Sequence, residues 1–199
     1  MGDVAHHQSY WRALYAVAHD LVSTLEPADV LNRLARSAAE ALNVRACTLR
    51  LLAPDGRTLN ASAHYGLSEG YLRKGGVDVE HSPVDREALQ GKSVSLRDVR
   101  HDPRFQYPEQ AATEGLVSLL CVPLIAHGRA IGVMRVYTGD ERTFDAEEIE
   151  FLDAIASLGA VSIENARLYQ RLAQDLDTTM DVLWGDNGSP PGSVAVRQE

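Results

Sequence analysis

Cys47 and Cys121 are the two cysteines of the sequence and its best candidates for nucleophilic or redox chemistry. A cysteine attacks as the thiolate, which requires a nearby base or cation and partial exposure to solvent. Each of the two lies inside an apolar run that is typical of a buried strand. We therefore expect both to be structural, and a thiol-dependent redox enzyme that uses Cys121 remains the alternative function.

Seven histidines offer metal-ligand chemistry, but their spacing does not favour a metal site. No pair has the His-x-x-x-His spacing that places two imidazoles on one face of a helix. The sequence also lacks the Gly-x-x-x-x-Gly-Lys-Ser/Thr string of a phosphate-binding loop. We expect no metal site and no kinase or ATPase chemistry, and the sequence identifies no cofactor.

The segment from residue 97 to residue 107 combines arginines, acidic residues and two aromatic residues, with little apolar periodicity. Loops of this composition often line binding sites. Two interpretations stay open. Either the arginines contact a ligand, or they are solvated while Phe105 and Tyr107 fill the pocket themselves.

The charge and the hydropathy of the chain limit its partners. The 199 residues carry a formal net charge of −9, spread along the chain, which disfavours binding to a phosphate backbone. No apolar run approaches the ~20 residues of a membrane span, and the N-terminus lacks the pattern of a secretory signal. We expect a cytoplasmic protein with neither a nucleic-acid nor a membrane partner.

The elements that must position these residues follow from apolar spacing and from turn residues. Spacings of three and four predict helices, and β-branched runs bounded by Gly, Pro or Asp predict strands. In chain order, the sequence predicts helices over 10–25 and 28–42, a hairpin over 44–53 and 58–65, a helix from 83 to about 91, a strand over 93–99, a helix over 109–114, a hairpin over 116–125 and 130–137, and a helix over 146–184.

This order of elements predicts an α+β fold with a central antiparallel β-sheet, helices on its faces, and long N- and C-terminal helices. The order and several local strings resemble the GAF domain family. The most specific of these strings are Cys121-Val122-Pro123-Leu124 with Ile131-Gly132-Val133, and Phe144-Asp145-Ala146-Glu147-Glu148 with Ile163-Glu164-Asn165-Ala166.

The resemblance implies a GAF/PAS-like domain with a pocket on one face of the sheet. Helices and loops between the third strand and the last hairpin would roof this pocket. We expect an N-terminal helix at 1–26, the GAF domain at 27–170, an extension of the C-terminal signalling helix at 171–184 and a disordered tail at 185–199.

The well-marked chemistries of the family lack their motifs in this sequence. The Asn-Lys-Phe-Asp-Glu string of the cyclic-nucleotide-binding members is absent, and neither cysteine matches the bilin-binding pattern. Members that reduce free methionine sulfoxide use closely placed cysteines, whereas these two lie at positions 47 and 121. We therefore predict a non-catalytic sensory domain that binds a small molecule or a partner.

Two sets of residues are candidates for this function. The pocket candidates are Arg50, Tyr65, Arg97, Arg104, Phe105, Tyr107, Ser118, Cys121, Arg135 and Tyr137. A narrow apolar stripe on the two terminal helices predicts a seam between two copies of the chain. This seam would contain Trp11, Leu14, Leu21, Tyr169, Leu176, Met180 and Leu183, and it would make the protein a homodimer that signals to an effector protein. The alternative is that the stripe on the C-terminal helix packs on the N-terminal helix of the same chain.

Overall fold

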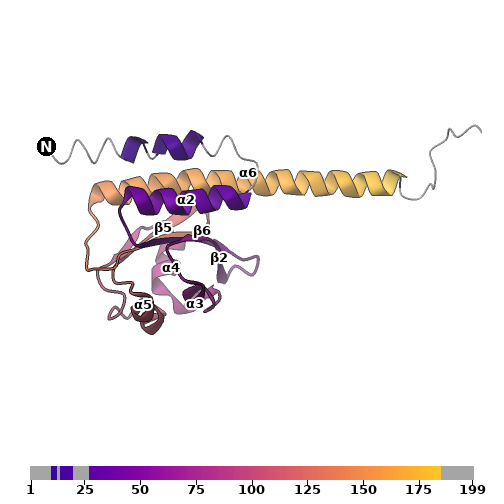
Figure 1. Cartoon of the computed structure of the whole chain (residues 1–199). Helices are drawn as coiled ribbons and strands as arrows, with labels where there is room; N and C mark the ends of the chain where they lie inside the picture. The colour runs from indigo at the N-terminus through magenta and orange to yellow at the C-terminus, as the bar shows by residue number, and fades with distance from the viewer. Residues whose placement is uncertain (1–9, 13, 20–26, 185–199) are drawn as a thin grey trace, which may run out of the picture. The chain divides into compact units, whose positions relative to one another are not determined.

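An antiparallel sheet of six strands forms the centre of the fold (Figure 1). The computed structural model describes residues 10–12, 14–19 and 27–184. The strands have the order β3-β2-β1-β6-β5-β4. Their bounds are β1 Ala46–Leu52, β2 Thr58–Tyr65, β3 Val77–Asp78, β4 Val94–Leu96, β5 Leu119–Ala126 and β6 Arg129–Tyr137.

Long helices cover one face of this sheet. Helix α2 (Pro27–Ala41) and the first part of α6 (Ala146–Trp184) lie over it (Figure 1). Apolar side chains of the sheet such as Leu49 and Met134 pack in one core with residues of these two helices. Described residues of the N-terminal helix add to this layer, since the ring of Tyr10 stacks on that of Phe151 at 4.5 Å between centroids. Buried apolar side chains of the sheet and of these helices form one core cluster in this layer.

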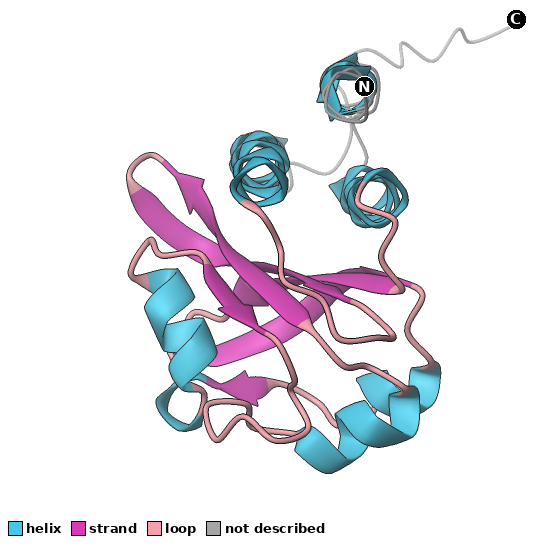
Figure 2. Ribbon diagram, turned by 90° about the vertical axis from the view of Figure 1, so that its left-hand side faces the viewer, coloured by secondary structure: helices cyan, strands magenta, loops and turns pink. Residues whose placement is uncertain are grey.

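Short helices cover the opposite face of the sheet, as Figure 2 shows. They are α3 (Glu69–Leu72), the 3-10 turn η1 (Val79–His81), α4 (Pro83–Leu89) and α5 (Pro108–Glu114). A second apolar cluster fills the space beneath them and includes Leu59, Val84 and Leu119. Unlike the first cluster, it surrounds several charged side chains.

The pairing of β1 with β6 depends on a glycine. Gly132 lies opposite Leu51, and a Cβ atom added at Gly132 would lie 2.2 Å from the backbone oxygen of Arg50. Any larger residue would therefore push the two strands apart. In the register of this close pair, Arg50 lies opposite Val133 and Thr48 lies opposite Arg135.

The predicted fold class is confirmed, with local differences. Strand β2 and helix α6 have the predicted bounds, while the predicted strand over 93–99 forms a ladder only at Val94–Leu96. The sequence prediction missed β3 and η1, which are too short to produce a periodic pattern. No helix in the described part of the chain is long and apolar enough to cross a membrane.

The chain divides into two compact units, residues 1–164 and 165–199, and α6 contributes to both. In the second unit, Leu168, Tyr169, Leu172 and Leu176 are exposed. Of the predicted seam, Trp11 is exposed and Leu14 is partly buried against the core, while Leu21 and the side chains of Met180 and Leu183 lie outside the described residues. The predicted tail at 185–199 also lies outside them.

Candidate functional site

Three strands place polar side chains on the sheet face beneath the short helices. Side chains alternate between the two faces of a strand, so Arg50 of β1, Cys121 of β5 and Arg135 of β6 share this face with Tyr137. The neighbours Leu49, Leu120 and Met134 point to the long helices instead. The alternation thus brings two arginines into an otherwise apolar layer.

Arg135 is neutralised by a carboxylate from helix α4. Its Nε donates to Oδ1 of Asp85 at 2.9 Å, its Nη2 pairs with Oδ2, and its Nη1 donates to the hydroxyl of Tyr137 at 3.3 Å. The hydroxyl of Ser82 donates to Oδ2 of the same carboxylate at 2.5 Å. Burial alone would lower the pKa of Arg135, but the Asp85 carboxylate outweighs it and raises that pKa well above its ordinary value.

Arg50 is just as deeply buried, at 0 % exposure, yet has no carboxylate partner in the described chain. Its Nη1 donates to the carbonyl of Leu59 at 3.2 Å and to that of Gly75 at 3.5 Å. Its Nε and Nη2 have no hydrogen-bond partner among the described residues. Burial, and then the charge of Arg135, lower the pKa of Arg50.

Lys74 adds a third basic group between two aromatic rings. Its Nζ lies 3.6 Å from the ring centroid of Tyr71 and 4.7 Å from that of Tyr107. This atom is inaccessible to solvent and has no hydrogen-bond partner in the described residues. Burial, followed by repulsion from Arg135 and Arg50, lowers the pKa of Lys74 to about 6.

We call these six residues the basic cluster: Arg50, Tyr71, Lys74, Asp85, Arg135 and Tyr137. The rings of Tyr71 and Tyr137 meet edge to face, with centroids 6.4 Å apart, and the Tyr71 hydroxyl has no hydrogen-bond partner within the described chain. Three basic groups thus face a single acid. Such an arrangement favours the binding of negative charge.

Cys121 borders the basic cluster, and Cys47 lies on the other face of the sheet. The Sγ atom of Cys121 lies 3.9 Å from Oδ1 of Asp85, while Cys47 belongs to the core beneath the long helices. Both thiols are fully buried. Burial raises the pKa of each, and the Asp85 carboxylate adds to the effect at Cys121.

A groove between α3 and α5 adjoins the basic cluster, with Tyr71 on its wall. Its volume is about 300 Å³, and it is lined by Ser68, Gly70, Tyr71, Glu109, Gln110, Thr113 and Glu114. The carboxylate of Glu114 accepts hydrogen bonds from the backbone N–H and the hydroxyl of Ser68, both at 2.6 Å. These two bonds hold α3 against α5.

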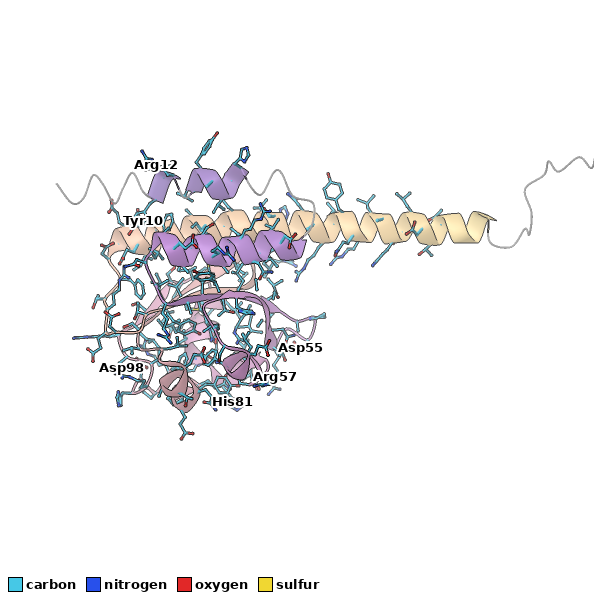
Figure 3. All side chains as sticks on the ribbon, viewed as in Figure 1. Tyr10, Arg12, Asp55, Arg57, His81 and Asp98 are labelled. Carbon is cyan, nitrogen blue, oxygen red and sulfur yellow. The ribbon has the colours of Figure 1, made fainter. Side chains whose placement is uncertain are left out.

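Two predicted pocket arginines lie outside the basic cluster. The side chain of Arg97 is 74 % exposed and pairs with Glu141, and that of Arg104 is 43 % exposed and forms a fork on Asp102. Asp98, which Figure 3 labels at the edge of the domain, binds Arg100 in the same way. Arg97 and Arg104 thus form exposed ion pairs away from the basic cluster, and their contact with a ligand stays a prediction.

Two further candidates have structural surroundings. Tyr65 packs with the long-helix core, on the wrong face of the sheet, because the pairing of β1 with β2 shifts by one residue between Leu49 and Arg50. Ser118 donates to the carbonyl of Arg97 at 2.6 Å and accepts from the backbone N–H of Arg142 at 2.8 Å. It therefore joins loops instead of facing the cluster.

The remaining candidates lie together beneath the short helices. Phe105 is buried in the apolar cluster there, and Tyr107 covers Lys74 while its hydroxyl donates to the carbonyl of Gly76 at 3.4 Å. Arg50, Cys121, Arg135 and Tyr137 meet on the strands, as described above. Among the described residues, no group of three His, Cys, Asp or Glu side chains is arranged to hold a metal ion.

Sequence reasoning missed Tyr71, Lys74 and Asp85. Asp85 follows Ser82 and Pro83, where an acid is expected merely to stabilise the first turn of a helix. The sequence does not reveal that Asp85 is completely buried, and buried acids are almost always paired. An arginine at an inward-facing strand position, such as Arg135, needs a buried acid, and Asp85 is that acid.

Comparison with known families agrees with this geometry. A model of the GAF domain family matches residues 24–164, which is more than half of the chain. The chain therefore belongs to the GAF domain family. Members are commonly sensory or ligand-binding domains. Comparison with curated protein sequences gave no match.

Solved structures with the same fold come from several kinds of protein. A GAF domain from a phosphoenolpyruvate-protein phosphotransferase of Coxiella burnetii has a TM-score of 0.74 at 18 % identity, covering 82 % of this chain and 98 % of that one. A domain from a protein described as a two-component sensor histidine kinase of Sinorhizobium meliloti has a TM-score of 0.61 at 26 % identity, covering 73 % and 96 %.

A third similar structure is an enzyme. The free methionine-R-sulfoxide reductase of Neisseria meningitidis, in complex with its substrate, has a TM-score of 0.67 at 19 % identity, covering 80 % of this chain and 91 % of that one. At this identity the likeness shows the fold alone.

Proposed function

We propose that this chain is a non-catalytic sensory GAF module that binds a small molecule at the basic cluster. One observation carries the proposal: charged and hydroxyl groups converge in a water-excluded layer between the sheet and the short helices, with several hydrogen-bonding atoms unmatched in the described chain. Small-molecule sites typically combine an apolar lining with a few such polar groups. Binding there would change the packing of α3, α4 and α5.

The competing function is thiol-dependent redox catalysis at Cys121. The observation in favour of this alternative is that a free methionine-R-sulfoxide reductase has a similar fold. Against it, Cys121 is fully buried beside a carboxylate, and both conditions raise the pKa of the thiol. A catalytic thiol needs the opposite surroundings.

A dimer of α6 helices is the proposed output of the module. Leu168, Tyr169, Leu172 and Leu176 are exposed at helical spacing on one helix. Exposed apolar stripes of this kind favour association with a second helix. Since α6 belongs to both units, it offers a continuous covalent route from the ligand domain to a homodimer partner or an effector protein.

The proposed setting is the cytoplasm, without nucleic-acid partners. The formal net charge of −9 supports this, because it disfavours binding to a phosphate backbone. The two arginines of the cluster, Arg50 and Arg135, are buried and so are too enclosed to contact a polymer.

Native mass spectrometry of the purified full chain tests the proposal. We expect a dimer mass and, in each protomer, either a retained small molecule or the uptake of one from a metabolite mixture. Hydrogen exchange with and without that molecule should then show increased protection in α3 and α4. A monomer that takes up no small molecule would contradict both parts of the proposal.

A further inference from the structure

We infer that the ligand of this module is a small oxyanion, a carboxylate or a phosphate, bound by the Nε and Nη2 edge of Arg50 together with the Tyr71 hydroxyl and the Lys74 amine. This inference rests on the proposed function and specifies its ligand class. Three observations support it: buried donors of these residues lack acceptors in the described part of the chain, other arginines of the chain bind carboxylates through the same edge, and the basic cluster has more cationic groups than acids.

Unmatched hydrogen-bonding atoms concentrate at one place in the fold. Of the five buried side-chain nitrogen and oxygen atoms without a partner among the described residues, four belong to Arg50, Tyr71 and Lys74. All four can donate a hydrogen bond. Because buried donors are paired in most native proteins, such a concentration calls for an acceptor from outside the chain.

The same edge of the guanidinium binds carboxylates elsewhere in this structure. Arg100 holds Asp98 through Nε at 2.8 Å and Nη2 at 2.7 Å. Arg104 holds Asp102 at 3.0 and 2.7 Å, and Arg135 holds Asp85 through the same two atoms. This planar fork matches carboxylate and phosphate geometry. At Arg50 the fork lies in the interior, and the described chain places no acid on it.

The charges of the basic cluster also call for an anion. The Asp85 carboxylate neutralises Arg135, which leaves the charge of Arg50 uncompensated. Lys74 lies close enough to both arginines that they lower its pKa. A monoanion would balance Arg50 alone, and protonation of Lys74 would accommodate a second negative charge.

A purely structural role explains these residues less well. A buried cation whose donors lack acceptors destabilises a fold, and an apolar residue of similar volume would fill the space without that cost. The two carbonyl contacts of Arg50 occupy only its Nη1 atom. The bonds from Ser68 to Glu114 close α3 over this region, so we expect a small ligand that enters when they open.

The test measures thermal unfolding and binding calorimetry of the full chain with sodium acetate, succinate and inorganic phosphate, against sodium chloride at equal ionic strength. We expect a saturable rise in the unfolding midpoint with at least one of the three, since a ligand that binds the native state stabilises it by mass action. The carboxylate and phosphate arms distinguish the two sources of an oxyanion.

Arg50→Lys keeps the charge and removes the fork, so we expect anion affinity to fall by at least about tenfold. Tyr71→Phe should lower it by about fivefold, which keeps the test decisive if Arg50→Lys folds poorly. The matched control is Arg97→Lys, because Arg97 is an exposed arginine outside the cluster and should leave binding unchanged.

Two results would overturn the inference. One is an equal shift with chloride. The other is an anion affinity that is the same in Arg50→Lys, in Tyr71→Phe and in the control Arg97→Lys. If no oxyanion binds while native mass spectrometry finds a neutral ligand, the ligand class is wrong and the sensory function stands. If neither kind of molecule binds, the sensory function itself fails.

Discussion

The carboxylate of Asp85 holds the Nε and Nη2 edge of Arg135 in the domain interior, where the two side chains are 0 % and 2 % exposed. The pair joins helix α4 to strand β6, and it keeps one of two neighbouring arginines neutralised. Arg50 shares the same sheet face with its corresponding edge unmatched in the described chain. The contrast between the two arginines underlies both the stability and the ligand proposals.

Replacing Asp85 with Ala should lower the free energy of unfolding by about 3–5 kcal/mol, because it leaves Arg135 buried without a counter-charge. Urea unfolding measures this change. Glu141→Ala is the control, since it breaks the exposed pair with Arg97 and should cost less than about 1 kcal/mol. Equal losses would mean that burial of the Asp85 pair has no energetic consequence.

Lys74 should make stability depend on pH. Its pKa is about 6 in the folded protein against an ordinary value of 10.5, so the unfolded chain binds more protons between these values. Folding stability contributed by this group therefore rises with pH across that window, by at most about 1.4 kcal/mol per pH unit. Lys74→Met removes the effect.

The measurement is the difference in unfolding free energy between the unmodified protein and Lys74→Met from pH 7 to about 9, without added carboxylate or phosphate. The groups that act on Lys74 are Arg135, Arg50, Asp85 and Glu114, and the raised pKa values of the two buried cysteines affect both proteins alike. Parallel curves would show that Lys74 keeps an ordinary pKa.

Both cysteines should resist a thiol reagent in the native protein. Cys47 and Cys121 are fully buried and their pKa values are raised, so labelling requires an opening of the fold. The same reagent in guanidinium chloride should label both and serves as the control. Rapid native labelling of Cys121 but not Cys47 would support the redox enzyme instead.

The α6 stripe should govern the oligomeric state. Tyr169, Leu172 and Leu176 are 69 %, 52 % and 61 % exposed, and Leu172→Asp with Leu176→Asp would bring charges into a desolvated seam. We expect the dissociation constant of the dimer to rise at least about a hundredfold in sedimentation analysis, while the domain stays folded.

Gln174→Asp is the matched control for this seam, because Gln174 is also exposed on α6 but lies away from the apolar stripe. It should leave the dimer intact. An unmodified protein that sediments as a monomer at tens of micromolar would remove the basis of the proposed output.

The sequence predicted the fold more fully than the site. Long amphipathic patterns such as that of α6 and the turn residues of the hairpins leave little freedom, so these elements appear where they were expected. The predicted boundaries at 26, 170 and 184 stay predictions. The site depends on which side chains converge, and that depends on register.

Tyr65 and Lys74 illustrate the difference. Tyr65 was predicted to line the pocket, but it packs with the long-helix core, beyond the register shift between Leu49 and Arg50. Lys74 sits in a loop with two glycines, where composition alone indicates a solvated turn, and tertiary packing between two tyrosine rings places its amine in the interior.

Gly132 is constrained by backbone packing, whereas Arg50, Tyr71 and Lys74 are constrained by the proposed ligand. Its contact with the backbone of Arg50 concerns main-chain atoms alone, so it does not depend on which side chain position 50 carries. In an alignment of homologues, glycine at position 132 should therefore persist even among proteins that have lost Arg50, Tyr71 and Lys74. If residues 50, 71 and 74 change together while position 132 stays glycine, the backbone packing is kept and the ligand preference has changed independently of it.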